Sequence, residues 1–280
     1  MKGAVTKMDK AYYHISEEAL GEGAKIPLVK MESSAAVFRA MADKMADCIL
    51  ANNAAGKHTV FICPVGPVGQ YPLFVERVNR ERISLKNVWF LNMDEYLEDD
   101  DTYIDRSSPL SFRGFMDRVV YSQIDPELVM PENQRVFPDP ADPARIDNVI
   151  EELGGVDIAF GGIGITGHLA FNEPQEELSC AEFAALPTRA RDIRPETRAT
   201  NSVGDLGGAL ECMPKRCVTI GMKQILGARE VCLGVFRDWH RAVVRRAAYG
   251  EQTAEFPATL AQNHPNACIY INDVAAKQPY

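Results

Sequence analysis

Two short segments carry side chains whose types and spacing are suited to moving protons. Residues 92–96 (NMDEY) place two adjacent carboxylates directly after an apolar run. Residues 161–174 (GGIGITGHLAFNEP) place His168 five positions before Glu173. A carboxylate can move a proton to and from a carbon next to a carbonyl, and a histidine held in one tautomer can act as acid and base. Both segments therefore predict acid–base chemistry on a small carbonyl compound.

Each segment also has a plainer interpretation. Asp94 and Glu95 are followed by an acidic run at residues 98–101, as expected for a solvated turn. A lone histidine is usually a satisfied structural residue, but the surrounding glycines, Gly164 among them, allow the backbone to approach a ligand closely. For His168 we favour a site, whereas for the acidic pair both interpretations stay open.

Two further segments follow apolar runs and bear on anion binding. Residues 64–70 (PVGPVGQ) contain Gly66 and lead into a helical pattern, so their backbone N–H groups could cradle a phosphate. They match no known phosphate loop, and an ordinary strand-to-helix turn is at least as good an interpretation. Residues 237–241 (RDWHR) place three cationic or titratable side chains at a predicted helix N-terminus, which suits either an anion or a charged cap. These side chains are Arg237, His240 and Arg241.

Apolar, β-branched runs recur along the chain and must position these residues. They lie at residues 59–63, 88–91, 156–160, 217–220, 231–236 and 268–271. Near-continuous runs of this kind are typical of parallel strands buried on both faces. Helical patterns separate them, at residues 37–48, 144–153 and 239–249. The alternation predicts an α/β protein, with a three-layer, Rossmann-like, mostly parallel sheet covered by helices on both faces, and a ligand at the carboxyl ends of the strands.

The chain shows no internal repeat and no linker. We expect residues 1–27 to form an N-terminal extension and residues 28–280 to form a single domain. Residues 175–213 are less periodic and are expected to form a long excursion such as a lid.

Composition narrows the class of protein. The 280 residues carry 30 Lys and Arg against 39 Asp and Glu, a net charge of −9, which argues against a nucleic-acid or anionic-membrane partner. The seven cysteines form no C-x-x-C pair or zinc-finger spacing, so we expect reduced thiols and no metal. Without an apolar leader or an 18-residue apolar run, the expected location is cytoplasmic.

Three sets of residues together resemble the glucosamine-6-phosphate deaminase family, part of a superfamily that also holds 6-phosphogluconolactonases. They are NMDEY at 92–96, GGIG with GHLAFNEP at 161–174, and TIG with AREV at 219–231. Order and spacing hold from about Val60 to Asp273. The resemblance implies an aldose–ketose isomerase or deaminase without a cofactor, acting on a small sugar. Relatives form both monomers and hexamers, so a homo-oligomer is an expectation.

The resemblance also implies roles for individual residues. Asp94 matches the base that shuttles a proton between C1 and C2 of the open-chain sugar. His168 matches the residue that assists ring opening, and Glu173 matches the carboxylate paired with it. We expect the remaining substrate-binding positions to be Gly66, Glu95, Gly164, Thr166, Gly167, Arg198, Arg237, His240 and Arg241.

Several positions depart from the family pattern. Thr166 replaces an aspartate, His240 replaces a phosphate-binding lysine, and Val203 replaces a phosphate-binding arginine. Arg198, Arg237 and Arg241 are the available substitutes. We therefore predict a sugar isomerase or deaminase whose substrate is not phosphorylated or carries its anion elsewhere. The alternatives are a non-catalytic sugar-binding regulator on the same scaffold and, with less support, a lactonase using His168.

Overall fold

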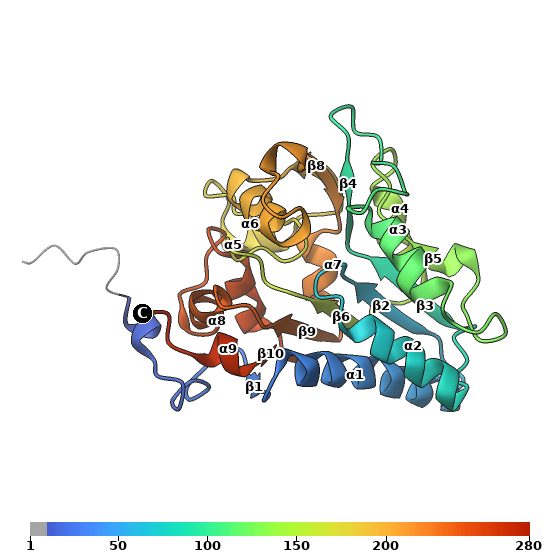
Figure 1. Cartoon of the computed structure of the whole chain (residues 1–280), viewed down its shortest axis with the longest axis horizontal. Coiled ribbons are helices and arrows are strands. Elements are labelled where there is room, and N and C mark those ends of the chain that lie inside the picture. Colours follow the sequence, from blue (N-terminus) through green and yellow to red (C-terminus); the bar gives the residue numbers. More distant parts are fainter. Residues whose placement is uncertain (1–9) are drawn as a thin grey trace, which may run out of the picture.

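The computed structural model describes residues 10–280, and a seven-stranded sheet lies at its centre (Figure 1). The strand order is β1-β10-β9-β6-β2-β3-β5, and every neighbouring pair runs parallel. The strands are Leu28–Lys30 (β1), Thr59–Cys63 (β2), Val88–Asn92 (β3), Arg135–Val136 (β5), Ile158–Gly161 (β6), Glu230–Val235 (β9) and Ala267–Ile271 (β10). The predicted parallel α/β sheet is confirmed.

Helices cover both faces of this sheet, as its sequence pattern requires. The alternation along β2 shows the division: Val60 and Ile62 join a core cluster with α4, α7 and α8, whereas Phe61 and Cys63 join a cluster with α1 and α2. The helices are Ser34–Ala54 (α1), Gln70–Glu81 (α2), Phe112–Met116 (α3), Ala144–Glu152 (α4), Cys180–Ala184 (α5), Pro195–Asp205 (α6), Met222–Leu226 (α7), His240–Tyr249 (α8) and Asp273–Ala276 (α9).

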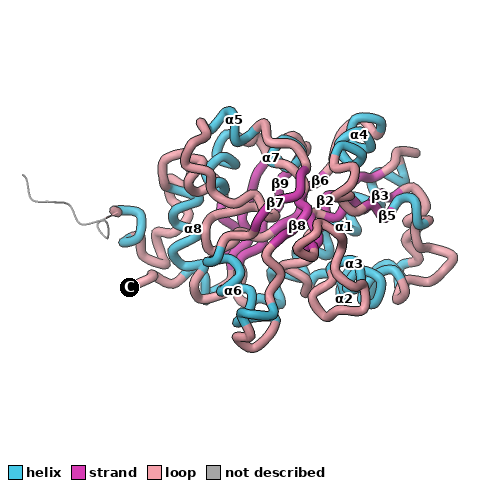
Figure 2. The backbone as a smooth tube through the Cα atoms, turned by 90° about the horizontal axis from the view of Figure 1, so that it is seen from above, coloured by secondary structure: helices cyan, strands magenta, loops and turns pink. Residues whose placement is uncertain are grey.

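A second, three-stranded antiparallel sheet corrects one prediction. Its order is β4-β8-β7, formed by Asp94–Leu97 (β4), Arg216–Thr219 (β8) and Arg189–Asp192 (β7). The run at 217–220 was expected in the parallel sheet and instead forms β8 here. Because β4 follows β3 after one residue, the small sheet stands at the carboxyl edge of the large one. Figure 2, seen from above, shows β7 and β8 over the middle of the large sheet.

Residues 1–9 of the predicted N-terminal extension lie outside the described residues, whereas its later residues pack on the core. Leu20 and Ile26 of the predicted N-terminal extension are buried in the main core. The excursion at 175–213 contains α5, β7 and α6, so most of it is regular structure beside the small sheet. Within residues 10–280, no helix is both long and apolar enough to cross a membrane.

Candidate active site

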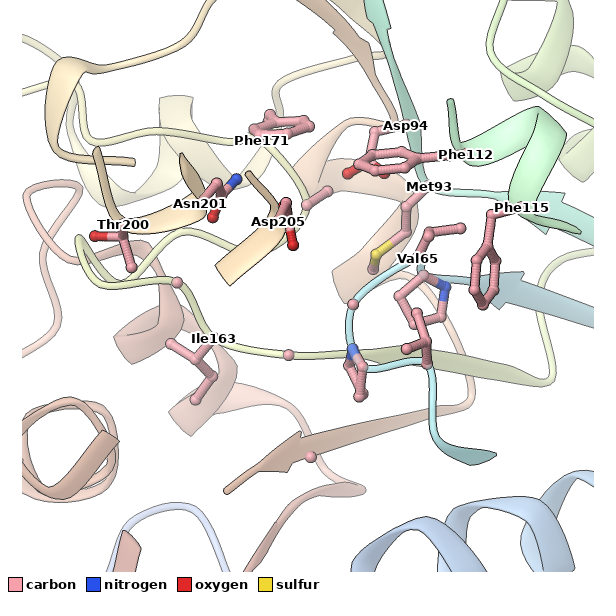
Figure 3. Close-up of a pocket in the computed structure, with 18 of the residues that line it drawn as sticks. Val65, Met93, Asp94, Phe112, Phe115, Ile163, Phe171, Thr200, Asn201 and Asp205 are labelled. Atoms are coloured by element: carbon pink, nitrogen blue, oxygen red, sulfur yellow. The ribbon is translucent and has the colours of Figure 1, made fainter. Parts of the chain in front are cut away.

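A cavity of about 510 Å³ opens at the carboxyl edge of the large sheet. The loops after β2, β6 and β9 line it, together with the start of β4 and part of α6. Figure 3 shows Asp94 and Phe112 reaching in from one side, with Asn201 and Asp205 of α6 across from them. The predicted residues Gly66, Gly164 and Arg237 also line this cavity.

Asp94 is the first residue of β4, and its side chain lines the cavity while only 7% exposed. Burial raises the pKa of this carboxyl well above its ordinary value, and the neighbouring charge of Glu95 raises it further. The alternative of a solvated acidic turn is therefore wrong for this pair. A carboxyl group whose pKa lies nearer neutrality can exchange a proton with carbon in both directions.

His168 also lines the cavity, and three side-chain oxygens surround its Nδ1. The distances to Nδ1 are 2.8 Å from Thr166 Oγ1, 3.2 Å from Glu173 Oε2 and 3.3 Å from Thr197 Oγ1. Thr166 donates its hydroxyl hydrogen to Glu173 Oε2 at 2.8 Å, so it can only accept from the imidazole. Nδ1 therefore carries a proton, and Nε2 is the nitrogen left for the cavity.

The Glu173 carboxylate has no exposed surface. Burial alone would raise its pKa, but the charge and hydrogen bond of His168 and the hydroxyls of Thr197 and Thr166 lower it to about 2. Glu173 is thus ionised at every physiological pH. Thr166, predicted as a substrate contact, lies between the two groups and orients His168 instead.

Glu95 is placed elsewhere than predicted. Successive side chains of a strand point to opposite faces, so Glu95 turns away from the cavity that Asp94 faces. Its carboxylate accepts hydrogen bonds from the backbone N–H groups of Phe112 and Arg113, at 3.0 and 2.8 Å, and from the Ser111 hydroxyl at 2.9 Å. The prediction that Glu95 binds substrate is corrected: it caps the N-terminus of α3.

His240 is a second correction. Its Nδ1 accepts from the backbone N–H groups of Phe236 and Arg237, at 3.2 and 2.9 Å. Its Nε2 therefore carries the proton and donates to the Ile163 carbonyl at 3.0 Å. Burial lowers the pKa of this imidazole to about 3. A neutral ring with both nitrogens satisfied provides no anchor for an anion.

Two predicted arginines are also held by the protein itself. Arg198 donates to the carbonyls of Pro214 and Met213, at 3.1 and 2.9 Å. Arg241 donates to the Val274 carbonyl at 3.2 Å. Neither lines the cavity, so both predictions of substrate contact are corrected. Gly167 lies in the turn that precedes His168, and its N–H donates to the Gly164 carbonyl.

Some site residues were not anticipated from the sequence. Thr197 does not line the cavity but contacts His168 Nδ1; it lies in a segment without a motif, and nothing in the sequence marks it. Phe38, Phe236 and Trp239 add aromatic surface at the end of the cavity beside the 64–69 loop. Phe236 could have been found, because it is the last residue of a predicted strand. Within residues 10–280, no group of His, Cys, Asp and Glu side chains could hold a metal ion.

Comparisons with known proteins identify relatives of this chain. No protein-family model matches the chain. The glucosamine-6-phosphate deaminase of Bacteroides fragilis is 30% identical over 235 residues, covering 81% of this chain and 82% of that protein. The glucosamine-6-phosphate deaminase of Geobacillus sp. is 28% identical over 249 residues, covering 86% and 92%.

Solved structures share the fold. A monomeric glucosamine-6-phosphate deaminase superposes with a TM-score of 0.77 at 23% identity, covering 89% of this chain and 98% of that one. The 6-phosphogluconolactonase of Trypanosoma cruzi superposes with a TM-score of 0.63 at 17% identity, covering 89% and 95%. At these identities the likeness concerns the fold alone.

Proposed function

The chain belongs to the glucosamine-6-phosphate deaminase family and is an enzyme of the deaminase/isomerase type, and from that premise we propose that its substrate is an amino sugar without a phosphate group. Asp94 is the proposed base at C2, and His168 is the proposed acid–base group for ring opening. Both face one cavity, which is large enough for a small-molecule ligand.

The charge of the cavity is the observation that carries the proposal. Of its lining residues, all within 10–280, Arg237 is the one with a permanent positive charge. Its guanidinium lies against α6, because a Cβ on Gly204 would come within 2.9 Å of Nη1. The acids Asp94 and Asp205 line the same cavity. A phosphate dianion would meet one cation and two acids, whereas an ammonium group would meet a favourable field.

The proposed chemistry follows from the hydrogen bonds of these side chains. His168, held with a proton on Nδ1, takes the proton of the C1 hydroxyl on Nε2 and returns it to the ring oxygen, which opens the sugar ring. Ionised Glu173 stabilises the imidazolium formed in between. Asp94 then removes the C2 proton while a proton of the substrate's ammonium group passes to O1, giving an enolamine, and Asp94 delivers the proton it has taken to C1. The resulting C2 imine is hydrolysed by water, which releases ammonia and a ketose.

The substrate class is tested by incubating the purified enzyme in D₂O with glucosamine and with glucosamine 6-phosphate. Exchange at C2 is followed by NMR and ammonia release by a coupled assay. We expect glucosamine to be turned over with the larger kcat/KM. One missing charge-assisted hydrogen bond to a phosphate costs about 1.5–3 kcal/mol. The kcat/KM for glucosamine 6-phosphate should therefore be at least about tenfold lower than that for glucosamine. A preference for the ester would overturn the proposal, and tight binding without exchange would identify a non-catalytic sugar binder.

Substituting Gly164 is expected to displace the His168 ring. A Cβ at this position would lie 2.0 Å from both Cε1 and Nε2 of the imidazole, so Gly164→Ala forces the ring to move. We expect kcat to fall by about 10²-fold or more, with a smaller change in KM. Steady-state kinetics of Gly164→Ala, His168→Asn and the double variant check the cause. If the two losses simply add, the glycine acts by some route other than the histidine.

A further inference from the structure

The end of the cavity beside the 64–69 loop has an aromatic lining. We call Phe38, Phe236 and Trp239 the aromatic wall, since all three line the cavity and are partly exposed, and Val65 adds aliphatic surface to the same lining. We infer that the aromatic wall is the subsite for the last carbon of the sugar, and that the substrate is a 6-deoxyhexosamine, which carries a methyl group at C6. This inference rests on the proposed function, because it assumes that C1 and C2 lie between Asp94 and His168.

The floor of the cavity connects its reacting end to the aromatic wall. Gly164 lies beneath the His168 ring. Two residues earlier, a Cβ on Gly162 would come 3.3 Å from Pro67, in the loop that carries Val65. Three residues of extended chain span at most about 10 Å. A six-carbon sugar with C1 and C2 near His168 is therefore long enough to extend toward the 64–69 loop and the aromatic wall.

An aromatic ring lies beside the N-terminus of helix α2. Helix α2 begins at Gln70 with Gly69 as its N-cap, and a helix N-terminus of this length favours negative charge. A Cβ on Gly69 would lie only 2.3 Å from the Phe38 ring. Phe38 also packs edge-on against Phe236, with ring centroids 4.8 Å apart. Phe38 therefore places an apolar ring beside the N-cap residue of α2, and Phe236 extends this apolar surface.

The part of the aromatic wall formed by Trp239, next to the start of α8, is also apolar. Trp239 packs on the neutral His240 ring, with centroids 3.8 Å apart. Both nitrogens of His240 are already hydrogen-bonded to the backbone. A C6 hydroxyl here would lose its hydrogen bonds to water without a matching partner on these rings, whereas a methyl group would bury apolar surface. The wall therefore favours methyl over hydroxymethyl, and hydroxymethyl over a phosphate ester.

The test uses three 2-amino-2-deoxyhexoses that differ only at C6, bearing methyl, hydroxyl or phosphate. We expect kcat/KM to be about tenfold higher for the methyl compound than for the hydroxyl compound, the scale on which an apolar pocket discriminates. Phe38→Ala should remove this preference mainly through KM, and Phe38→Leu should keep part of it. Val203→Ala is the matched control, because Val203 is 72% exposed and lies outside the cavity.

The outcomes separate the two proposals. Equal turnover of the methyl and hydroxyl compounds, unaltered in Phe38→Ala, overturns the inference and leaves the proposed function standing. Preference for the phosphate ester overturns both. If no compound exchanges at C2, the proposed function fails. Binding of the same compounds, measured by thermal shift, then tests the role of the aromatic wall by itself. Tighter binding of the methyl compound, lost in Phe38→Ala, then supports it, and equal binding overturns it.

Discussion

Asp94→Asn is expected to lower C2 exchange by about 10²–10⁴-fold, the contribution of a well-placed general base. Asparagine has nearly the same shape, so the cavity and KM should change little. NMR exchange in D₂O measures the loss directly. Asp99→Asn is the matched control, because Asp99 is exposed and lies outside the cavity. Retained exchange in Asp94→Asn would remove Asp94 from the mechanism.

The raised pKa of Asp94 also gives a pH dependence with a defined sign. Because the base must be ionised, kcat/KM of the wild type should fall as pH drops through this pKa, which lies well above the value of about 3.9 for an ordinary aspartate.

The free energy of unfolding is expected to show the opposite pH dependence. The native state holds the proton more tightly than the unfolded chain, so stability falls as pH rises from the ordinary pKa to the raised one. The Tm of Asp94→Asn should not show this loss of stability as pH rises. If the Tm of the wild type and of Asp94→Asn depend on pH in the same way, the pKa of Asp94 is not raised by burial.

Glu95→Ala is expected to reduce the free energy of unfolding by about 3–5 kcal/mol. Glu95 has no exposed surface, and its Oε2 lies 3.1 Å from Arg113 Nε. Removing the carboxylate leaves the Arg113 guanidinium without this partner and also leaves two backbone N–H groups at the start of α3 without an acceptor. Denaturant unfolding measures the loss.

The conservative variant identifies the cause. Glu95→Gln keeps an acceptor oxygen at the start of α3 but removes the charge, so its loss of stability should be smaller. Ser111 and Phe112 line the cavity, so in Glu95→Ala the KM should rise together with the loss of stability. A change below about 1 kcal/mol would show that water replaces the carboxylate at this site.

Hydrophobic patterning predicts most of the large sheet but not the small one. Strands such as β2 and β9 are nearly continuous apolar runs because helices cover both of their faces. Strand β8 has the same appearance for a different reason: the loop after His168 packs against it, with the Phe171 N–H donating to Thr219 Oγ1 at 3.0 Å. Apolar patterning reports burial, and it does not report strand direction. Strand β4 was missed because its two acids resemble a solvated turn.

The candidate site follows from sequence only where residues come directly after strands. Asp94, Gly66 and Arg237 line the cavity for this reason, since the carboxyl ends of parallel strands meet at one edge. Glu95 was misplaced because adjacent carboxylates in a strand face opposite sides. Phe38 was missed because it lies on α1 next to the core residue Val37. Helical periodicity identifies the buried face and gives no sign of which aromatic beside it reaches a ligand.

Met93, the residue between β3 and β4, joins the two sheets through its backbone. Its N–H donates to the Cys63 carbonyl at the end of β2 (2.9 Å), and its carbonyl accepts from the Ile220 N–H just after β8 (2.7 Å). Main-chain bonds therefore hold the residue that precedes Asp94, and a change of side chain does not remove them. The aromatic wall, by contrast, consists of side chains alone. Substitutions in the aromatic wall can therefore change the group bound at the far end of the proposed sugar without removing the main-chain bonds that hold Met93 beside Asp94.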